Sequence, residues 1–340
     1  METSPGATQH PPVSVVLAVR NEQRSLLDAV SNVLAQDYDG ALEVVIAVGP
    51  STDETARIAT DLTKRDSRVR TVANPTGRTP AGLNAAIAAA RHDVIARVDG
   101  HAMLPPHYIR VAVELLVTTG ADNVGGVMAP EGSGPFQQAV ARAMCSPIGV
   151  GSTPFRTSAP AGPASSVYLG VFRRAALERV GGYDESYLRG QDWELNHRIR
   201  KTGGLVYFSP ELKVVYHPRA DMRSFARQYF HTGRWRRAIM RQHRETVTLR
   251  YLAPPAMVVA VGAGTLGAVA GRPAGLALPG GYLACIVAAS LATGRGLPAA
   301  ARLRLPLVYA TMHGAWGLGF LTSPVRLAAA AVPVNCAEVT

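Results

Sequence analysis

The first part of the chain alternates between short apolar runs and longer stretches with a helical pattern. Runs of apolar, mostly β-branched residues lie at 13–19, 42–48, 69–73 and 94–98. Each run is too short for a helix and has the length of a strand that is buried on both faces. The stretches between the runs have helical patterns, at about 22–35, 53–64 and 77–92. This alternation predicts βαβ units and a mostly parallel sheet.

The pattern becomes more mixed after residue 104. Helices are predicted near 105–118, 135–145, 173–180 and 191–202, and short strands near 166–171, 204–208 and 213–216. We therefore expect an α/β domain over residues 13–220. The Pro-rich residues 1–12 are expected to be disordered, and because they lack a basic region followed by an apolar core, we expect no signal peptide there.

Three long apolar runs follow at 252–271, 274–293 and 305–323; none contains Asp, Glu, Lys or Arg, and the one histidine among them is His313. Each run is close to the ~20 residues that cross the hydrocarbon core of a bilayer. A charged residue at the centre of such a helix would cost about 2.5–3.5 kcal/mol, so uncharged runs of this length are informative. We expect a membrane region over residues 252–323 with two to three helices, followed by a tail at 324–340.

The net charge of +11 comes almost entirely from Arg, and the stretch from Arg219 to Arg250 holds nine Arg and no Lys. Residues 221–250 are therefore predicted to be a basic amphipathic segment beside the membrane. Arg residues precede the first apolar run and follow the second, whereas only Arg272 separates the two. By the positive-inside rule the large domain is expected to face the cytoplasm at the inner membrane. No nucleic-acid-binding motif accompanies the charge, which argues against nucleic acid as a partner.

The three cysteines, Cys145, Cys285 and Cys336, are far apart and form no CxxC motif. This spacing argues against a disulfide framework and against a zinc site. We expect the cysteines to be small apolar residues of a protein in a reducing compartment.

Three polar clusters follow the predicted strands, namely Arg20-Asn21-Glu22, Ser51-Thr52-Asp53 and Asp99-Gly100-His101. Ligands of parallel α/β sheets bind at the carboxyl ends of the strands, so these clusters predict a site at one edge of the sheet. The carboxylate of Asp99 and the imidazole of His101 could share a divalent cation that also holds phosphates. The alternative is a simple turn that follows an apolar strand interrupted by Arg97, which we expect to be buried.

Two further carboxylates have both a functional and a structural interpretation. Asp53 could accept a hydrogen bond from a base or a ribose, or it could belong to the first turn of the next helix. Asp192, near the start of the helix predicted at 191–202, could act as a general base or only complement the helix dipole.

Several motifs occur in an order that is typical of one family. They are VSVVLAVRNE at 13–22, STDET at 51–55, NAAIAAAR at 84–91, the Asp99-Gly100-His101 cluster, SVYLGVFRRAALERVGGYDES at 166–186 and QYFHTGRWRR at 228–237. With these motifs the chain resembles the inverting family 2 glycosyltransferases of the GT-A fold. Within that family it is similar to the membrane-associated transferases of bacterial exopolysaccharide assembly, the succinoglycan-type group.

The resemblance implies a GT-A catalytic domain, C-terminal transmembrane helices and a set of roles. Asp192 would be the catalytic base, and Asp99 and His101 would hold Mn²⁺ or Mg²⁺. The nucleotide-sugar donor, a UDP-sugar with UDP-glucose favoured, would be bound by Arg20, Asn21, Glu22, Asp53, Asn84 and Asp99. The acceptor or diphosphate side would be formed by Gln228, Arg234 and Trp235. The acceptor would be a glycan or a polyprenyl-linked sugar at the membrane.

Two positions depart from the family pattern. His101 stands where the family usually has the second Asp of its DxD motif, and Gln191 stands where it has the Glu that precedes the catalytic Asp. These departures put the metal preference and the pH profile in question. Two alternatives stay open, a polyprenyl-phosphate glycosyl synthase and an inactive nucleotide-binding scaffold of the same fold.

Overall fold

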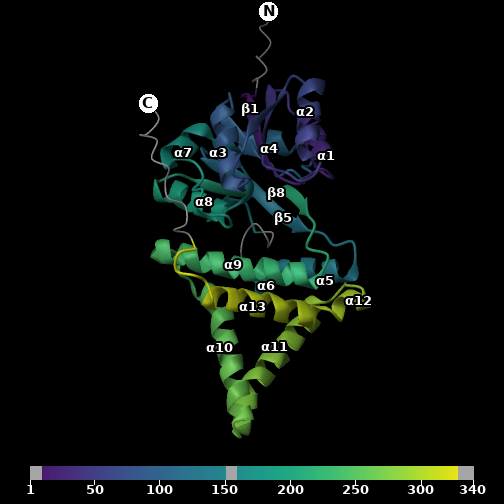
Figure 1. Ribbon diagram of the computed structural model, residues 1–340, viewed down its shortest axis with the longest axis vertical. Coiled ribbons are helices and arrows are strands. Elements are labelled where there is room, and N and C mark those ends of the chain that lie inside the picture. Colours follow the sequence, from purple (N-terminus) through teal and green to yellow (C-terminus); the bar gives the residue numbers. More distant parts are fainter. Residues whose placement is uncertain (1–9, 151–158, 328–340) are drawn as a thin grey trace, which may run out of the picture. The chain divides into compact units, whose positions relative to one another are not determined.

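The computed structural model describes residues 10–150 and 159–327, and the chain forms two compact units. Of the described residues, the first unit comprises 10–129 and 159–215, and the second comprises 130–150 and 216–327. The first unit holds a sheet covered by helices, and the second is helical (Figure 1). Residues 130–150, which lie inside the predicted 13–220 domain, thus belong to the second unit.

The sheet of the first unit has eight strands in the order β3-β2-β1-β4-β7-β5-β8-β6. Their bounds are β1 Val13–Val19, β2 Leu42–Val48, β3 Val69–Ala73, β4 Val94–Arg97, β5 Asn123–Pro130, β6 Gly162–Pro163, β7 Tyr168–Arg173 and β8 Val206–Tyr216. Strands β1 to β4 pair in parallel, whereas β7 runs antiparallel to β4 and β5. The predicted α/β fold with a mostly parallel sheet is therefore confirmed.

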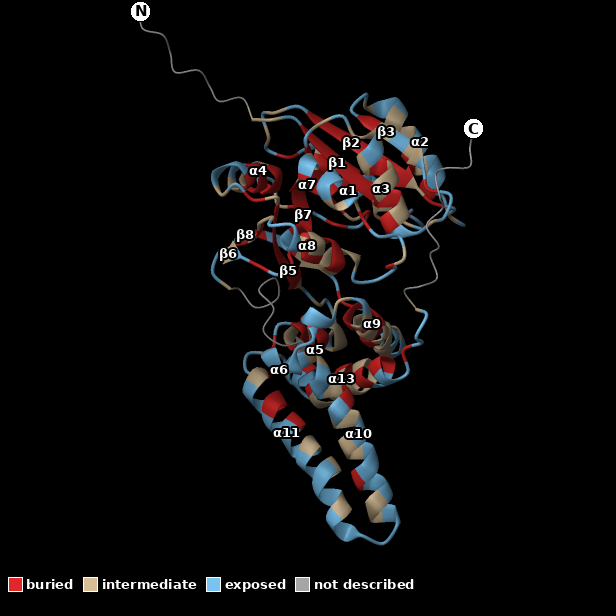
Figure 2. Ribbon diagram, turned by 90° about the vertical axis from the view of Figure 1, so that its left-hand side faces the viewer, coloured by how far each residue is buried: buried red, intermediate tan, exposed pale blue. Residues whose placement is uncertain are grey.

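Helices cover both faces of this sheet, as the buried strands between partly exposed helices in Figure 2 show. These helices are α1 Leu26–Leu34, α2 Thr55–Arg65, α3 Thr79–Ala89, α4 Tyr108–Thr118, α7 Arg174–Val180 and α8 Gln191–Lys201. The core of the unit joins β1, through Val15 and Leu17, to Val30 of α1 and Ile109 of α4, and all four side chains are fully buried. The runs of β1, β2 and β4 become strands because a strand inside the sheet buries both of its faces, whereas β3 lies at the edge of the sheet and is partly exposed.

Strand β5 was not predicted, because its sequence NVGGVMAP carries two central glycines. The structure explains both glycines by close backbone approach. A Cβ on Gly125 would lie 2.7 Å from the carbonyl oxygen of Tyr168, and one on Gly126 would lie 1.8 Å from that of Leu212. The pairing of β5 with β7 also shifts register between Val124 and Gly126, as at a β-bulge. The two short strands predicted at 204–208 and 213–216 are one strand, β8.

The second unit is built from helices. Their bounds are α5 Pro135–Met144, α6 Pro147–Val150, α9 Met222–Gln242, η2 Arg244–Thr246, α10 Leu249–Val269, η3 Pro273–Leu276, α11 Ala277–Thr293, α12 Ala299–Arg302 and α13 Leu305–Leu321. The side chain of Asp221 begins α9 by accepting a hydrogen bond from the backbone N–H of Ser224 at 2.8 Å.

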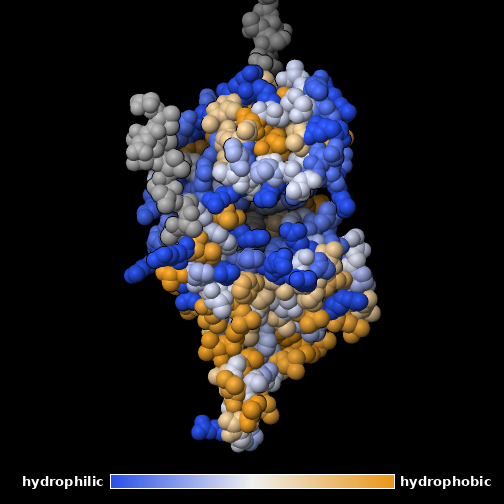
Figure 3. Space-filling view, in the orientation of Figure 1, coloured by the Kyte–Doolittle hydropathy of each residue, from blue (hydrophilic) through white to orange (hydrophobic). Residues whose placement is uncertain are grey.

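Two segments of this unit, Leu249–Val269 and Pro273–Thr293, are long and apolar enough to cross a membrane. Each has 21 residues, which corresponds to about 31 Å of helix and matches the hydrocarbon core. They form a hairpin that exposes large apolar side chains such as Leu266 and Leu283, and hydrophobic residues gather over it in Figure 3. The hairpin closes where Gly264 meets Gly275, since a Cβ on Gly264 would lie 2.6 Å from the Gly275 carbonyl oxygen.

The third apolar run forms α13, which packs along α9. A Cβ on Gly233 would lie 2.0 Å from the carbonyl oxygen of Trp316, so the two backbones touch where glycine removes the side chain. Arg237 of α9 donates hydrogen bonds to the carbonyl oxygens of Phe320 and Leu321 at the end of α13, at 3.0 and 2.7 Å. We expected two to three membrane helices, and two segments have the length and composition of membrane spans. The third run forms the 17-residue α13, which packs against the Arg-rich helix α9.

The cysteines were predicted to be apolar filler, and this was wrong for the two that lie within the described residues. Cys145 and Cys285 are both exposed. Cys285 lies on the outer surface of α11, where a lipid environment would accept an apolar thiol. Cys336 lies outside the described residues.

Candidate active site

The loops that follow β1 and β2 interlock at the carboxyl edge of the sheet. Asn21 has a left-handed backbone with φ of 58°, a conformation that Asn tolerates better than most residues. Its backbone N–H donates to the Ser51 hydroxyl at 3.1 Å, and its side-chain oxygen accepts from the backbone N–H of Thr52 at 2.9 Å. The backbone N–H of Glu22 donates to the Thr55 hydroxyl at 2.7 Å. The first two predicted clusters are thus brought together.

Asp53 closes this pair of loops with both carboxylate oxygens. Oδ1 accepts from the Thr55 hydroxyl at 2.6 Å and from its N–H at 3.1 Å, and Oδ2 accepts from the N–H of Gln23 at 3.2 Å. The hydroxyl of Thr55 is the main reason that the pKa of Asp53 lies below its ordinary value. Since α2 begins at Thr55, Asp53 precedes the helix and is not part of its first turn.

The Asp99-Gly100-His101 cluster forms a turn directly after β4. The backbone N–H of Ala102 donates to the carbonyl oxygen of Asp99 at 2.9 Å. Gly100 is required by packing, because a Cβ there would lie 2.9 Å from Cγ1 of Val19 at the end of β1. This turn is closed by backbone atoms and not by the side chains of Asp99 and His101, the two predicted metal ligands.

His101 faces a carboxylate on the neighbouring loop. Its Nδ1 lies 3.0 Å from Oε1 of Glu22, whose Oε2 accepts from the Ser25 hydroxyl at 2.8 Å. A carboxylate on one imidazole nitrogen is the usual surrounding of a histidine that binds a metal through the other nitrogen. The carboxylate of Asp99 and the imidazole of His101 are ligand types that divalent cations such as Mn²⁺ accept.

Arg97, the last residue of β4, connects two of the predicted acids. Its Nη2 lies 3.0 Å from Oδ1 of Asp99, and its Nη1 donates to Oδ1 of Asp192. Burial by itself would lower the pKa of Arg97, but the charges of Asp192 and Asp99 outweigh burial and hold that pKa well above its ordinary value. A charged guanidinium thus lies between Asp99 and Asp192. The one signal of this pairing in the sequence is a charged residue inside an apolar strand.

Asp192 lies in the first turn of α8, which is anchored to its surroundings by buried charges. Glu194 is 2% exposed and accepts two hydrogen bonds of 2.7 Å from Arg198, one at each oxygen. Arg198 also donates to the carbonyl oxygen of Val180. These contacts tie α8 to the end of α7.

Asn84 binds the loop between α7 and α8. Its side-chain amide donates to the carbonyl oxygen of Tyr183 at 2.8 Å and accepts from the N–H of Tyr183 at 2.8 Å. The same amide nitrogen lies 3.2 Å from Oε1 of Glu185. Of the other predicted donor-binding residues, Arg20 is exposed at the same edge of the sheet, beside Gly77.

Gln228, Arg234 and Trp235 lie on α9 in the second unit. Gln228 donates to the Tyr216 hydroxyl at 3.2 Å, and Trp235 is 7% exposed, so it is packed inside this unit. The guanidinium of Arg234 lies 5.5 Å from the centre of the Phe230 ring. Its Nε has no hydrogen-bond partner among the described residues.

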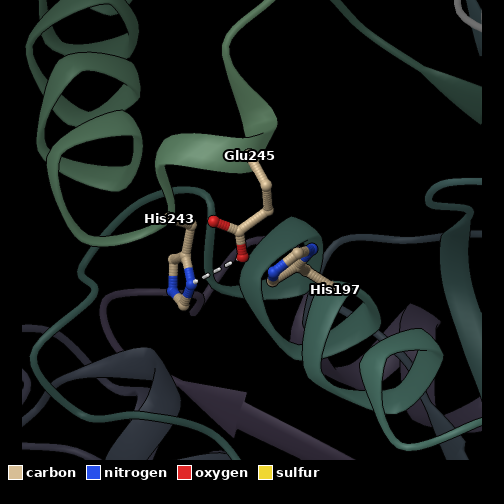
Figure 4. Close-up of side chains that lie close together, drawn as sticks. All are labelled: His197, His243 and Glu245. Carbon is tan, nitrogen blue, oxygen red and sulfur yellow. Dashed lines mark ion pairs between the residues drawn. The ribbon is translucent and has the colours of Figure 1, made fainter.

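Three further titratable residues were not predicted to have a role. His243 and Glu245 follow α9, and Nδ1 of His243 lies 4.0 Å from Oε1 of Glu245, as the dashed line in Figure 4 marks. His197, also labelled there, belongs to α8 of the first unit, where it is buried and stacks on Trp193 at 5.3 Å between ring centres.

Comparisons with known proteins agree with the sequence motifs. The sequence profile described as "Glycosyl transferase family 2" matches residues 14–181. Succinoglycan biosynthesis protein ExoA of Rhizobium meliloti is 35% identical over 285 residues, which cover 82% of this chain and 84% of that protein. A dolichyl N-acetyl-alpha-D-glucosaminyl phosphate 3-beta-D-2,3-diacetamido-2,3-dideoxy-beta-D-glucuronosyltransferase of Methanococcus voltae is 21% identical over 230 residues, 65% of this chain and 71% of that protein.

A solved structure has the same fold. The mannosyltransferase PcManGT from Pyrobaculum calidifontis, in complex with GDP-Man and Mn²⁺, matches with a TM-score of 0.58 at 20% sequence identity, over 94% of this chain and 89% of that one. At 20% identity this likeness shows the fold alone, which is GT-A. Taken with the relative that is 35% identical over most of both chains, these findings show that the chain belongs to glycosyl transferase family 2 and is a glycosyltransferase.

Proposed function

We propose that this enzyme is a metal-dependent inverting glycosyltransferase that moves a sugar from a nucleotide-sugar donor to a glycan or lipid-linked acceptor in cell-surface polysaccharide assembly. The observation that carries the proposal is the pairing of Asp99 and Asp192 through Arg97. It brings a carboxylate at the end of a strand next to one at the start of a helix, although the two are far apart in the sequence. The carboxylate proposed for donor binding, Asp99, thereby lies near the one proposed for proton removal, Asp192.

The donor side of the site is formed by the interlocked loops of Arg20, Asn21, Glu22 and Asp53. A UDP-sugar, with UDP-glucose favoured, is the proposed donor, and this choice comes from the family resemblance. The fold neighbour was solved with GDP-Man, so guanosine donors belong in the same test.

Asp99 and His101 would hold the divalent cation, with Glu22 orienting the imidazole. A bound Mn²⁺ or Mg²⁺ would neutralise charge on the diphosphate leaving group. The neighbour's complex with Mn²⁺ supports the use of a divalent ion.

Asp192 would act as the general base. As the acceptor oxygen forms its bond to the anomeric carbon, Asp192 takes the hydroxyl proton, and the bond from that carbon to the diphosphate breaks on the opposite face. One displacement inverts the configuration and releases the nucleoside diphosphate. Because the side chain of Asp192 is 38% exposed, an acceptor could reach its carboxylate.

The proposals for the acceptor and for the cellular location of the enzyme rest on the second unit and on the names of the relatives. One relative is named for succinoglycan biosynthesis and another for transfer to a dolichyl-phosphate-linked sugar, which supports a glycan or polyprenyl-linked acceptor. Gln228, Arg234 and Trp235 are proposed to serve this acceptor or the diphosphate. The hairpin of α10 and α11 has only Arg272 near its tip, which supports an inner-membrane enzyme whose catalytic domain is cytoplasmic.

Two alternatives use the same fold. A polyprenyl-phosphate glycosyl synthase would transfer the sugar to a lipid phosphate, and the mass of the product separates it from the main proposal. An inactive nucleotide-binding scaffold is the second alternative, kept open by His101 and Gln191.

Donor turnover tests the proposal. Membranes that carry the protein are offered UDP-glucose, UDP-galactose, UDP-GlcNAc and GDP-mannose with Mn²⁺ or Mg²⁺ and a native lipid extract. We expect release of the nucleoside diphosphate from one donor, and loss of this release with EDTA and in Asp99→Asn. No release from any donor would support the inactive scaffold, and release that EDTA does not affect would refute the metal dependence.

A further inference from the structure

Arg97 is a buried charge in a strand whose other residues are apolar. Strand β4 lies between β1 and β7, and the Arg97 side chain is 8% exposed. Burying a guanidinium is costly unless it is paired and hydrogen-bonded. Packing alone would favour an apolar residue at this position, so the presence of Arg requires a reason in the chemistry of the site.

The two partners of Arg97 come from different segments of the first unit. Asp99 is two residues away in the turn after β4, whereas Asp192 is 95 residues away at the start of α8. The guanidinium is a rigid planar fork, and one fork fixes the positions of two carboxylates relative to each other. A lysine ammonium, which is a point charge on a flexible stem, would fix this geometry less well.

Few other contacts orient the carboxylate of Asp192. Helix α8 begins after Gly190, which has a left-handed φ of 75°, and no side chain caps this end of the helix. Within the ranges that the structure describes, Arg97 is the one hydrogen-bond partner of the Asp192 side chain. Without the guanidinium, Asp192 would be free to change rotamer and would also lose the positive charge between it and Asp99.

We propose that Arg97 is a positioning residue that fixes the Asp192 carboxylate relative to Asp99, and so aligns the acceptor hydroxyl with the sugar of the donor. This inference rests on the proposed function, because it assigns proton removal to Asp192. Arg97 forms no bond with the substrates in this account and acts only through the two carboxylates. Its loss therefore lowers kcat more than it raises the KM for the donor.

The test compares Arg97→Gln and Arg97→Lys with a matched control, Arg70→Gln. Arg70 also pairs with a buried carboxylate, Glu43, at 2.9 Å, but this pair lies at the opposite end of the strands. All variants are made in the full chain, and kcat is counted per UDP-binding site, measured by titration with UDP and Mn²⁺. This normalisation removes the effect of any fraction that is not folded.

We expect Arg97→Gln to lower kcat about a hundredfold, the lower end of the contribution of a well-placed general base, with a change in donor KM below about threefold. Arg97→Lys should recover about tenfold of that loss, because the charge is kept and the fork is not. Arg70→Gln should leave kcat per site within about twofold of the wild type.

Two results would overturn the proposal: kcat per site of Arg97→Gln within about threefold of the wild type, or an equal loss in Arg97→Gln and Arg70→Gln. If Arg97→Gln binds no UDP, Arg97→Lys decides, since a tenfold lower kcat at unchanged donor KM supports the proposal and an unchanged kcat refutes it. A wild-type chain that turns over no donor would refute the proposed function, and this inference with it.

Discussion

The side-chain amide of Asn84 forms two hydrogen bonds with the backbone of Tyr183, one donated and one accepted, each 2.8 Å long. Tyr183 is 3% exposed, and burial raises the pKa of its hydroxyl. Asn84 therefore joins α3 to the loop that leads into α8, the helix that carries Asp192. The family resemblance implies that Asn84 binds the donor, and its hydrogen bonds to Tyr183 give it a structural role within the first unit.

Asn84→Ala would leave the buried N–H and carbonyl oxygen of Tyr183 without partners. Unsatisfied buried groups cost about 1–3 kcal/mol, so we expect the free energy of unfolding to fall by about this amount. Denaturant unfolding of the full chain, followed together with the KM for the donor, measures the effect. If the KM rises while the stability is unchanged, Asn84 contacts the donor and the structural interpretation is wrong.

Val259 lies in the middle of α10 and is 57% exposed, whereas Leu249 begins the helix and is 86% exposed. In a bilayer Val259→Lys would place a charge near the centre of the membrane at a cost of about 2.5–3.5 kcal/mol, which shifts insertion about a hundredfold. Leu249→Lys is the matched control, because its ammonium can reach the lipid headgroups.

After a carbonate wash, we expect little of the Val259→Lys protein to remain in the membrane fraction, because its α10 does not insert. The Leu249→Lys protein should remain in the membrane fraction. In a water-soluble protein both positions would tolerate lysine equally, since both are exposed. Equal recovery of the two variants from the membrane fraction would therefore contradict membrane insertion of α10.

Glu43 is a buried acid at the end of the sheet opposite to the candidate site. Burial, the largest influence, would raise its pKa, but hydrogen bonds from the Ser14 hydroxyl, the Arg91 N–H and Arg70 together lower the pKa below its ordinary value. A carboxyl whose folded pKa is lowered stabilises the fold fully above its unfolded pKa, about 4.3, and loses this contribution as the pH falls through the folded value.

Glu43→Gln is therefore expected to reduce stability at pH 7 and to flatten the loss of stability below about pH 4.3. Urea unfolding midpoints at several pH values compare the variant with the wild type. An acid-induced loss as steep in the variant as in the wild type would show that Glu43 does not titrate on unfolding in this range.

The sequence was sufficient for the parallel half of the sheet, because β1 to β4 are short, mostly apolar runs with helices between them. It was insufficient for β5, whose glycines weaken the strand pattern and make sense only beside Tyr168 and Leu212. It left open whether there are two or three spans. The third run forms α13, which has 17 residues against 21 for each candidate span. Its contacts with Gly233 and Arg237 of α9 are visible only in the structure.

The same limit applies to the candidate site. The strand-end clusters predicted that the loops after β1, β2 and β4 would meet, and the hydrogen bonds between Asn21 and Thr52 show the first two together. The pairing of Arg97 with Asp192 could not be predicted, because the two residues are 95 positions apart and only the tertiary fold brings them together. An Arg inside an apolar strand was the available signal, and it indicated burial but not the contact.

Asp192→Asn tests the central claim most directly, because it removes the proposed base and keeps nearly the same shape. Transfer from the active donor and binding of UDP with Mn²⁺ are measured on the same preparation. We predict that transfer falls by about 10²–10⁴-fold, the usual contribution of a general base, while nucleotide affinity stays nearly intact. Transfer close to that of the wild type, or loss of nucleotide binding together with transfer, would contradict the assignment of Asp192 as the base.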